Sequence, residues 1–217
     1  MTKNHQKPTR QYGGVDAAQR LKERREKFIA AGLEAFGADG YGQASVKKIC
    51  RLAGLTERYF YESFENKEDL LCGVFRQLTA ELEAEAQQII EIPGIAPRDA
   101  IRRTLENFFG RFADDPRRAR IQLFEVLGVS PRVDREYRES LQVLARWVEI
   151  SWLALFPDID RDWLRSTIIP VSTAGGVIAV AHHWVLDGFT TPVADIVAQA
   201  MEMLTALGCY YQEKHRV

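Results

Sequence analysis

Apolar residues recur at every third or fourth position along most of the 217-residue chain, and this spacing restricts the fold more than any other feature. It is clear between Leu21 and Phe36 and again between Tyr137 and Leu155. A half-buried strand would instead alternate apolar and polar positions, and the sequence shows almost no such alternation. We therefore predict an all-α protein of roughly nine helices, since helices usually run about 10–14 residues.

The composition is that of a globular protein, with 46% apolar and 27% charged residues, which argues against wholesale disorder. The three cysteines, Cys50, Cys72 and Cys209, are odd in number and far apart. They predict neither a disulfide framework nor a metal site, and they fit a reducing cytosol. The first residues are polar and basic and lack the apolar core of a signal peptide. We expect a cytoplasmic protein without a metal or another cofactor.

One stretch, from Thr167 to Leu186, is apolar enough to raise the question of a membrane span. It contains Pro170, and the two histidines His182 and His183 stand near its end. Charged or titratable groups are costly inside a bilayer. The stretch therefore favours a helix buried in protein over one that crosses a membrane.

The charge is divided unevenly along the chain. Residues 1–67 hold 13 Lys and Arg against 8 Asp and Glu, a net charge of +5, whereas the remainder carries 16 basic and 22 acidic residues, a net charge of −6. A basic front suggests a segment that lies near a polyanion, and a chance fluctuation is the alternative.

The segment that follows Ser45 has the order of a helix-turn-helix unit. Ser45 can cap one helix, Gly54 permits a left-handed turn, and Thr56 can cap a short second helix. Asn66, with Asp69 three residues on, can cap a further helix. In a helix-turn-helix unit the second helix enters the major groove of DNA, although any three-helix bundle would show a similar pattern.

The residues themselves carry more information than the pattern. Ala44 to Leu71 resembles the DNA-binding signature of the tetracycline-repressor (TetR) family of transcriptional regulators, and the resemblance covers about residues 20–75. Arg58 departs from the signature, because the family often has Gly at this position. The matching positions are Val46, Ile49, Ala53, Gly54, Phe60, Tyr61, Phe64, Asn66, Lys67 and Leu70.

We expect nine residues of this segment to contact DNA. Lys67, in the first turn of its helix, would hold a phosphate together with free backbone N–H groups. The resemblance implies a phosphate contact for Tyr61, and the alternative is a core ring. The nine residues are Ser45, Lys47, Lys48, Thr56, Glu57, Arg58, Tyr59, Tyr61 and Lys67.

Arg58 can pair with guanine O6 and N7, but a phosphate contact or an intrahelical pair with Glu62 is the alternative. Glu57 can accept from cytosine N4 or simply be solvated. Lys47 and Lys48 are phosphate candidates that can equally be solvated surface lysines. The tail basics Lys3, Lys7 and Arg10 would lie along the DNA or belong to a disordered tail.

These assignments divide the chain into a basic tail at 1–17, a helix-turn-helix domain at 18–66 and a ligand-binding and dimerisation domain at 67–217. The resemblance implies a homodimer in which the last two helices, about 160–186 and 192–211, form a four-helix bundle. Small and apolar residues there would allow close approach and supply apolar area. The candidate interface residues are Val171, Gly175, Ile178, His182, Ile196 and Met203.

A ligand pocket would lie among the helices of residues 97–156 and the inner face of residues 70–90. Aromatic side chains there suit a flat or lipophilic ligand, although an ordinary helical core is the alternative for most of them. His182 and His183 lack a third ligand at metal-site spacing, so an interface or core role is favoured over metal binding. The candidate pocket residues are Phe108, Phe109, Phe112, Phe124, Trp147 and Trp152.

The sequence contains no G-x-S-x-G, Gly-rich phosphate loop, H-E-x-x-H or C-x-x-C motif, so we expect no enzyme. The hypothesis is a homodimeric transcriptional repressor that binds a palindromic operator in double-stranded DNA and is released by a small effector. The alternatives are a regulator without a small ligand and a helical interaction module that does not bind DNA.

Overall fold

The computed structural model describes residues 13–215, and within this range it contains helices and no strand. An all-α fold is thus confirmed, with ten α-helices and one π-helical turn in place of the roughly nine helices expected. The elements are α1 (Gly13–Asp39), α2 (Val46–Ala53), α3 (Glu57–Ser63), α4 (Lys67–Ile90), α5 (Pro97–Asp114), α6 (Pro116–Arg120), η1 (Ile121–Glu125), α7 (Pro131–Leu155), α8 (Arg161–Ser166), α9 (Ile169–Leu186) and α10 (Val193–Lys214).

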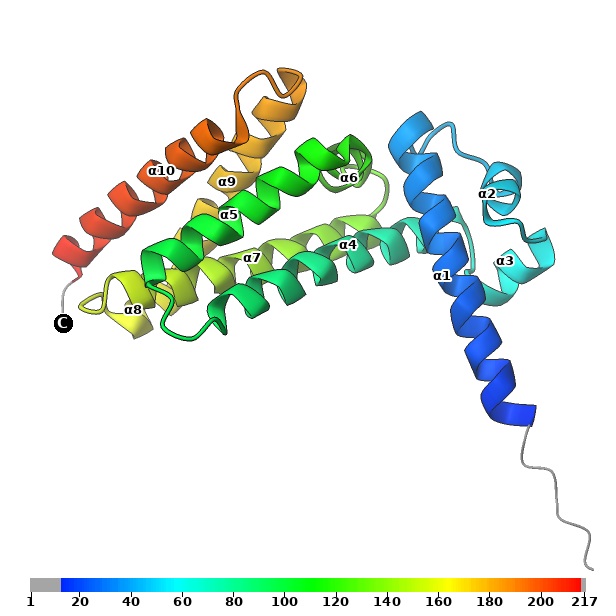
Figure 1. Cartoon of the computed structure of the whole chain (residues 1–217), viewed down its shortest axis with the longest axis horizontal. Coiled ribbons are helices and arrows are strands. Elements are labelled where there is room, and N and C mark those ends of the chain that lie inside the picture. The colour runs from blue at the N-terminus through cyan, green and yellow to red at the C-terminus, as the bar shows by residue number, and fades with distance from the viewer. Residues whose placement is uncertain (1–12, 216–217) are drawn as a thin grey trace, which may run out of the picture.

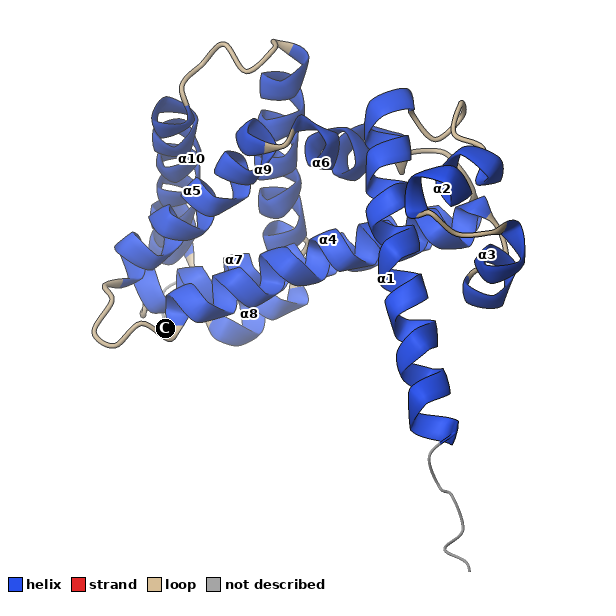
Figure 2. Cartoon of the chain, turned by 45° about the vertical axis from the view of Figure 1, so that its right-hand side comes forward, coloured by secondary structure: helices blue, strands red, loops and turns tan. Residues whose placement is uncertain are grey.

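The first three helices form a head at one end of the molecule, and α5 to α10 form a larger body (Figures 1 and 2). In the head, α2 and α3 pack on α1 around the buried rings of Phe28, Phe60 and Phe64. Phe28 meets Phe60 edge to face, with ring centroids 5.4 Å apart. These aromatic contacts fix the position of α3 on the long first helix.

Helix α4 begins in the head and runs on into the body (Figure 1). Its first half is buried in the head core through Leu70, Leu71 and Val74. Ile121 and Val133, from the body, are buried in the same cluster. Head and body therefore share one apolar core along α4.

The body differs from the sequence prediction where a single helix was expected over 160–186. The chain forms α8, breaks at Thr167 and Ile168, and starts again as α9. Pro170 stands in the first turn of α9, where a missing N–H costs no helical hydrogen bond, so the proline delimits the helix. The last helix extends to Lys214, three residues past its expected end.

Helix α9 is the one helix in the described range that is long and apolar enough to cross a membrane, with a mean hydropathy of 1.3. It was expected to be buried in protein, but only 28% of it is buried within this chain. Ile168 just before it and Leu186 at its end are 73% and 67% exposed. A face of this helix is thus left without a partner in the single chain.

The first helix also differs from its expected bounds. It begins at Gly13, whereas residues 1–17 were expected to form a tail, and residues 1–12 with the tail basics Lys3, Lys7 and Arg10 lie outside the described range. No capping pattern marks this start in the sequence, which is why it was missed. At the other end the helix continues through Gly37 and stops at Gly40, whose φ of 90° favours glycine.

Gly37 lies inside α1 and permits a close contact between head and body. A Cβ built on Gly37 would lie 2.3 Å from Cβ of Arg117 and 3.0 Å from its Cα, which belongs to the backbone of α6. Only a residue without a side chain allows α1 and α6 to approach so closely. The contact is a long-range one, so nothing in the local sequence distinguishes it from a helix end.

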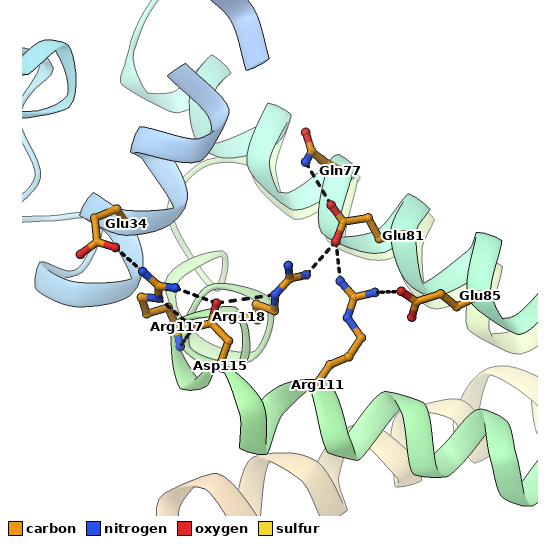
Figure 3. Close-up of polar contacts among 8 residues, drawn as sticks. All are labelled: Glu34, Gln77, Glu81, Glu85, Arg111, Asp115, Arg117 and Arg118. Atoms are coloured by element: carbon orange, nitrogen blue, oxygen red, sulfur yellow. Dashed lines mark hydrogen bonds and ion pairs between the residues drawn. The ribbon is translucent and has the colours of Figure 1, made fainter. Parts of the chain in front are cut away.

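A chain of charged groups surrounds this contact and links α1, α4, α5 and α6 (Figure 3). Arg117 pairs with Glu34 of the head and with Asp115, and its Nε lies 2.7 Å from Oδ1 of Asp115. Arg118 reaches Oε2 of Glu81 on α4 at 2.7 Å. Figure 3 shows how the chain continues from Glu81 through Arg111 to Glu85, so that it runs from the head along one side of α4.

A second group of polar contacts between head and body lies beside the ion pairs of Arg117. Arg120 donates from Nη1 to the carbonyl of Ala38 at 2.6 Å and pairs with Glu125 at 2.9 Å. Glu125 in turn accepts from the backbone N–H of Tyr41 at 2.7 Å. The loop that follows α1 is therefore held by side chains of α6 and η1.

The charge chain shifts the titration of its carboxylates. Burial alone would raise the pKa of Glu81, but hydrogen bonds from Arg118, Gln77 and Arg111 outweigh it and lower that pKa. The hydrogen bond from Arg117 lowers the pKa of Asp115. Both carboxylates are thus held in the ionised form that the ion pairs require.

Gly208 of α10 provides a test of the packing between the helices of the body. A Cβ on it would lie 2.0 Å from the ring of Phe156, so we expect Gly208→Ala to lower the free energy of unfolding by about 1–3 kcal/mol. Gly110→Ala is the matched control, because a Cβ there has no neighbour within 4 Å and a helical alanine should raise stability by about 0.5–1 kcal/mol. Thermal denaturation of both variants measures the difference, and equal melting temperatures would contradict the packing.

Glu81→Gln tests the charge chain through its pH dependence. Because the folded pKa of Glu81 lies below its usual value of 4.5, its stabilisation is present above that pH and is lost as the pH falls through the folded pKa. We expect Glu81→Gln to cost about 1 kcal/mol at neutral pH and progressively less as the pH falls below 4.5. Melting temperatures of the wild type and the variant, measured across pH, show whether their difference in stability decreases as the pH falls. Glu106→Gln, at an exposed position on α5, should show no such trend.

Candidate DNA-binding surface and effector cavity

The turn between α2 and α3 is built by the residues predicted for it. Ser45 caps α2, its Oγ accepting from the backbone N–H of Lys48 at 3.2 Å. Gly54 adopts a left-handed conformation with φ 64°, and its N–H returns to carbonyls of the last turn of α2. Thr56 stands at the start of α3 as expected, but its side chain makes no capping hydrogen bond. Its hydroxyl is therefore left on the exposed surface.

The three aromatic residues of α3 divide between core and surface. Phe60 is fully buried, whereas Tyr61 is 59% exposed, so Tyr61 is not the core ring that the sequence left as an alternative. Tyr59 is half-buried beneath the guanidinium of Arg24, which lies 3.9 Å from the ring centroid. The hydroxyl-bearing edge of Tyr61 is thus available to a partner, and Tyr59 is held against α1.

Arg58 extends from the surface with 84% of its side chain exposed. Its Nε donates to Oε1 of Glu62 at 3.0 Å, so the intrahelical pair is formed. Within the described residues its two terminal nitrogens have no partner. The exposed N-terminal end of α3 therefore presents the hydroxyl of Thr56, the carboxylate of Glu57 and the two free terminal nitrogens of Arg58.

The expected lysines behave differently from one another. Lys47 is exposed, whereas Lys48 is half-buried and pairs with Asp39 at the end of α1. The ammonium group of Lys67 donates to the carbonyls of Tyr41 at 2.6 Å and Ala44 at 2.9 Å. It also lies 4.2 Å from the ring centroid of Tyr41, and burial lowers its pKa.

Lys67 thus binds the loop before α2 to the start of α4. Two of its three N–H groups are used there, so a phosphate could take only the third. Asn66 caps α4, with Oδ1 accepting from the N–H of Asp69 at 2.8 Å, as predicted. The carboxylate of Asp69 accepts from Glu65 rather than from Asn66, and it also pairs with Arg132 of α7.

Sequence reasoning missed three arginines of this surface. Arg24 bonds Glu62 at 3.1 Å, and Arg25 donates to the carbonyl of Ser63 at 2.6 Å, so both hold α1 against α3. They lie in a run of alternating charges that resembles an ordinary solvated helix face. Arg51, in the last turn of α2, is exposed beside the turn.

The body encloses a cavity between α4, α5, α7, α9 and α10 with about 1320 Å³ of space free of atoms, its open side included. Four predicted aromatic residues line it, namely Phe108, Phe112, Trp147 and Trp152. Among the remaining residues of its wall, apolar side chains such as Phe75, Leu105 and Met201 alternate with a few polar ones, including Thr79, Asn107, Gln122 and Ser151.

Two predicted pocket residues do not reach this wall. Phe109 is fully buried on another side of α5 and meets Trp184 edge to face at 5.7 Å. Phe124 lies in the π-helical turn and stacks on His182, with ring centroids 4.3 Å apart. Helical periodicity shows that a residue is buried, but it does not show which neighbour covers it.

The expected interface residues also separate. Val171, Gly175, His182 and Met203 are half-buried, Ile178 lines the cavity, and Ile196 is buried in the body core. Of these six residues, Ile196 alone is covered within the single chain, since Ile178 is itself half-buried. The exposed positions of α9 and α10 instead include Ala179, His183, Leu186, Ala206 and Tyr210. In the described residues, no group of three or more His, Cys, Asp or Glu side chains can hold a metal ion.

Comparison with known proteins begins with the head. Residues 28–72 match the family described as bacterial regulatory proteins, tetR family. The fatty acid metabolism regulator protein of Bacillus subtilis is 37% identical over 60 residues, which cover 26% of this chain and 31% of that protein. The regulator EthR of Mycolicibacterium smegmatis is 25% identical over 146 residues, 67% of this chain and 65% of that protein. The chain thus spans less than two thirds of either curated relative.

Solved structures share the fold of nearly the whole chain. FadR from Bacillus halodurans has a TM-score of 0.71 at 19% identity, covering 83% of this chain and 94% of that one. FadR from Bacillus subtilis, solved in complex with stearoyl-CoA, has a TM-score of 0.69 at 19% identity over 82% and 96% of the two chains. Residues 28–72 thus match the tetR family of bacterial regulatory proteins, and the chain as a whole shares the all-helical fold of these solved structures.

Proposed function

We propose that the chain is a homodimeric, cytoplasmic transcriptional repressor that binds a palindromic DNA operator and leaves it when a small, largely apolar effector enters the body. The observation that supports this proposal is the separation of α3 into a buried apolar side and an exposed polar end. Its apolar side is buried in the head, while Thr56, Glu57, Arg58 and Tyr61 face outward from one exposed end. A recognition helix needs this division, because base edges are met by the side chains at its N-terminal end.

On DNA, α3 would enter the major groove. The free terminal nitrogens of Arg58 would meet guanine O6 and N7, with Glu62 orienting the guanidinium through Nε. Tyr61 and Lys47 would bind phosphates on either side of the groove, and the Ser45 hydroxyl can donate to a phosphate while it accepts from the N–H of Lys48. Lys48 and Lys67, which already have partners, would chiefly hold the head in shape.

The exposed face of α9 and α10 supports the homodimer. It combines small residues, Ala179 and Ala206, with large apolar ones, Leu186 and Tyr210. Small residues allow two helix pairs to approach, and the apolar groups would leave water on association. A two-fold dimer would present two copies of α3 to a palindromic site.

The cavity supports an effector, and α4 supports its coupling to DNA. Phe75 of α4 and Tyr137 of α7 belong both to the core shared with the head and to the wall of the cavity. An effector that displaces these side chains would shift α4 and, through the Arg117 contacts with Glu34, the head itself. FadR from Bacillus subtilis, which shares this fold, was solved in complex with stearoyl-CoA, and the long acyl chain of that ligand supports an apolar effector here.

DNA binding is tested by fluorescence anisotropy with the duplex upstream of the gene, a scrambled duplex and a salt series. We expect Lys47→Ala and Tyr61→Phe to weaken binding to all duplexes, with Lys47→Ala lowering the salt slope by about one. Arg58→Ala should relax the preference at one base pair by about 1–3 kcal/mol. Arg102→Ala is the matched control, because it removes a paired surface arginine from α5. If all three head variants bind DNA as the wild type does, the DNA-binding proposal fails, and a helical interaction module becomes the better description of the chain.

The switch is tested through linkage, with methyl stearate, a neutral ester with a long acyl chain, as the probe. If ligand and DNA favour different states, saturating probe weakens DNA binding by the same factor by which DNA weakens probe binding, typically about 5–150-fold. Arg117→Gln removes the link to Glu34 and should reduce that factor, whereas Arg165→Gln, which breaks an ion pair with Glu149 within the body, should not. Independent binding of probe and DNA would favour a regulator without a small ligand.

A further inference from the structure

The cavity wall has an unusual charge content. Glu83 of α4 is its one charged side chain, and no lysine, arginine or histidine of the described residues lines it. Its other polar groups are alcohols, amides, indoles and the phenol of Tyr137, with Thr104, Ser140 and Thr205 among the alcohols. A ligand inside this cavity would therefore meet no cation.

The rim beside Glu83 adds to this effect. A shallow hollow between α4 and α7 shares Glu83 with the cavity and is lined in addition by Arg76, Glu136 and Glu139. Arg76 is paired with Glu136 at 2.6 Å. Glu83 and Glu139 have no partner among the described residues, so the rim is negatively charged.

An anionic group would be poorly placed in either region. Burying a carboxylate without a cation or several hydrogen bonds costs far more than an apolar chain returns, and the acidic rim would repel it on entry. The part of the ligand that the cavity encloses is therefore not anionic.

One polar group in the wall lacks a partner. Trp152 is 1% exposed and lines the cavity, and its indole Nε1 is buried without a hydrogen bond. The other such atom in the described residues, Oε1 of Gln212, does not bond with it. Around the ring lie Phe156, Ile159 and Leu164, whose side chains cannot accept a hydrogen bond. The ring of Tyr211 also packs here, with its centroid 6.2 Å from that of Trp152, but its hydroxyl does not bond to Nε1.

A buried indole N–H almost always has an acceptor, and leaving it unpaired costs free energy. Because Trp152 lines the cavity, a ligand that moves the side chains around the ring would be able to supply one. A ketone, ester, lactone or thioester oxygen fits the need, because each accepts a hydrogen bond without carrying a charge.

We propose that the cavity binds a neutral, predominantly aliphatic molecule with a carbonyl-type oxygen, and that Nε1 of Trp152 donates to this oxygen. The inference deepens the proposed function by naming the class of effector. It concerns binding alone, so it can be tested without DNA and can fail independently of the repressor model.

The experiment measures displacement of Nile red from the full chain by four probes of matched chain length. These are methyl undecyl ketone, tridecane, tridecanoate and tridecylamine. We expect the ketone to bind about five- to tenfold more tightly than tridecane, the gain expected for one neutral hydrogen bond, and tridecanoate to bind more weakly than the ketone. Trp152→Phe should remove the preference for ketone over tridecane and leave tridecane binding nearly unchanged.

Trp147→Phe is the matched control, since Trp147 also lines the cavity and Nε1 of Trp147 is not among the buried unpaired atoms. It should keep the ketone preference. Circular dichroism melting confirms that both variants fold, and the wild-type ranking of the four probes remains decisive if either does not.

Three outcomes would overturn the proposal. Tightest binding of tridecanoate would show that an anion is accommodated despite the wall. Tightest binding of tridecylamine would assign recognition to Glu83 instead of Trp152. A ketone preference that survives in Trp152→Phe, or is absent from the wild type, would show that the indole N–H does not donate a hydrogen bond to the ligand oxygen. If the ketone binds as expected but leaves DNA affinity unchanged, the repressor model fails while this assignment stands.

Discussion

The burial of α4 on both sides of the head–body boundary is the constraint on which the rest of the structure depends. Leu70 and Leu71 of this helix are fully buried with the head, and a few residues later Phe75 reaches the cavity wall. Close-packed interiors transmit displacement because they contain little free volume. A body that opens or closes around a ligand must therefore move α4, and with it the head.

Packing alone would let the head pivot on α4, and the polar contacts of α6 limit this movement. The close approach of Gly37 to Arg117 leaves no room for a sliding side chain, and the ion pairs of Arg117 and Arg120 bracket the contact. Exposed ion pairs are individually weak, so their role lies in geometry more than in stability. Apolar burial along α4 therefore stabilises the junction of head and body, whereas the charged groups fix the orientation of the head.

The elements of the helix-turn-helix could be predicted because their determinants are local. Ser45, Gly54 and Asn66 act on backbone groups within four residues, and each adopts the predicted role. The sequence failed where a partner is distant. The contact of Gly37 with Arg117 could not be predicted, because the two residues are 80 positions apart. The hydrogen bonds from Lys67 to the carbonyls of Tyr41 and Ala44 likewise carry no signal in the sequence. Aromatic periodicity likewise identified buried rings without separating the cavity wall from the solid core.

The same distinction bears on how far the relatives inform the ligand. In this chain the cavity lies among α4, α5, α7, α9 and α10, and the relatives share the fold that arranges these helices. Side chains determine its chemistry, and at 19% identity most of them differ between this chain and the solved FadR structures. A single lysine in the wall would favour an anionic ligand, whereas the lone Glu83 and the unpaired indole of Trp152 favour a neutral acceptor. The class of effector is therefore a property of these few side chains, and it can change between relatives while the route from cavity to head stays the same.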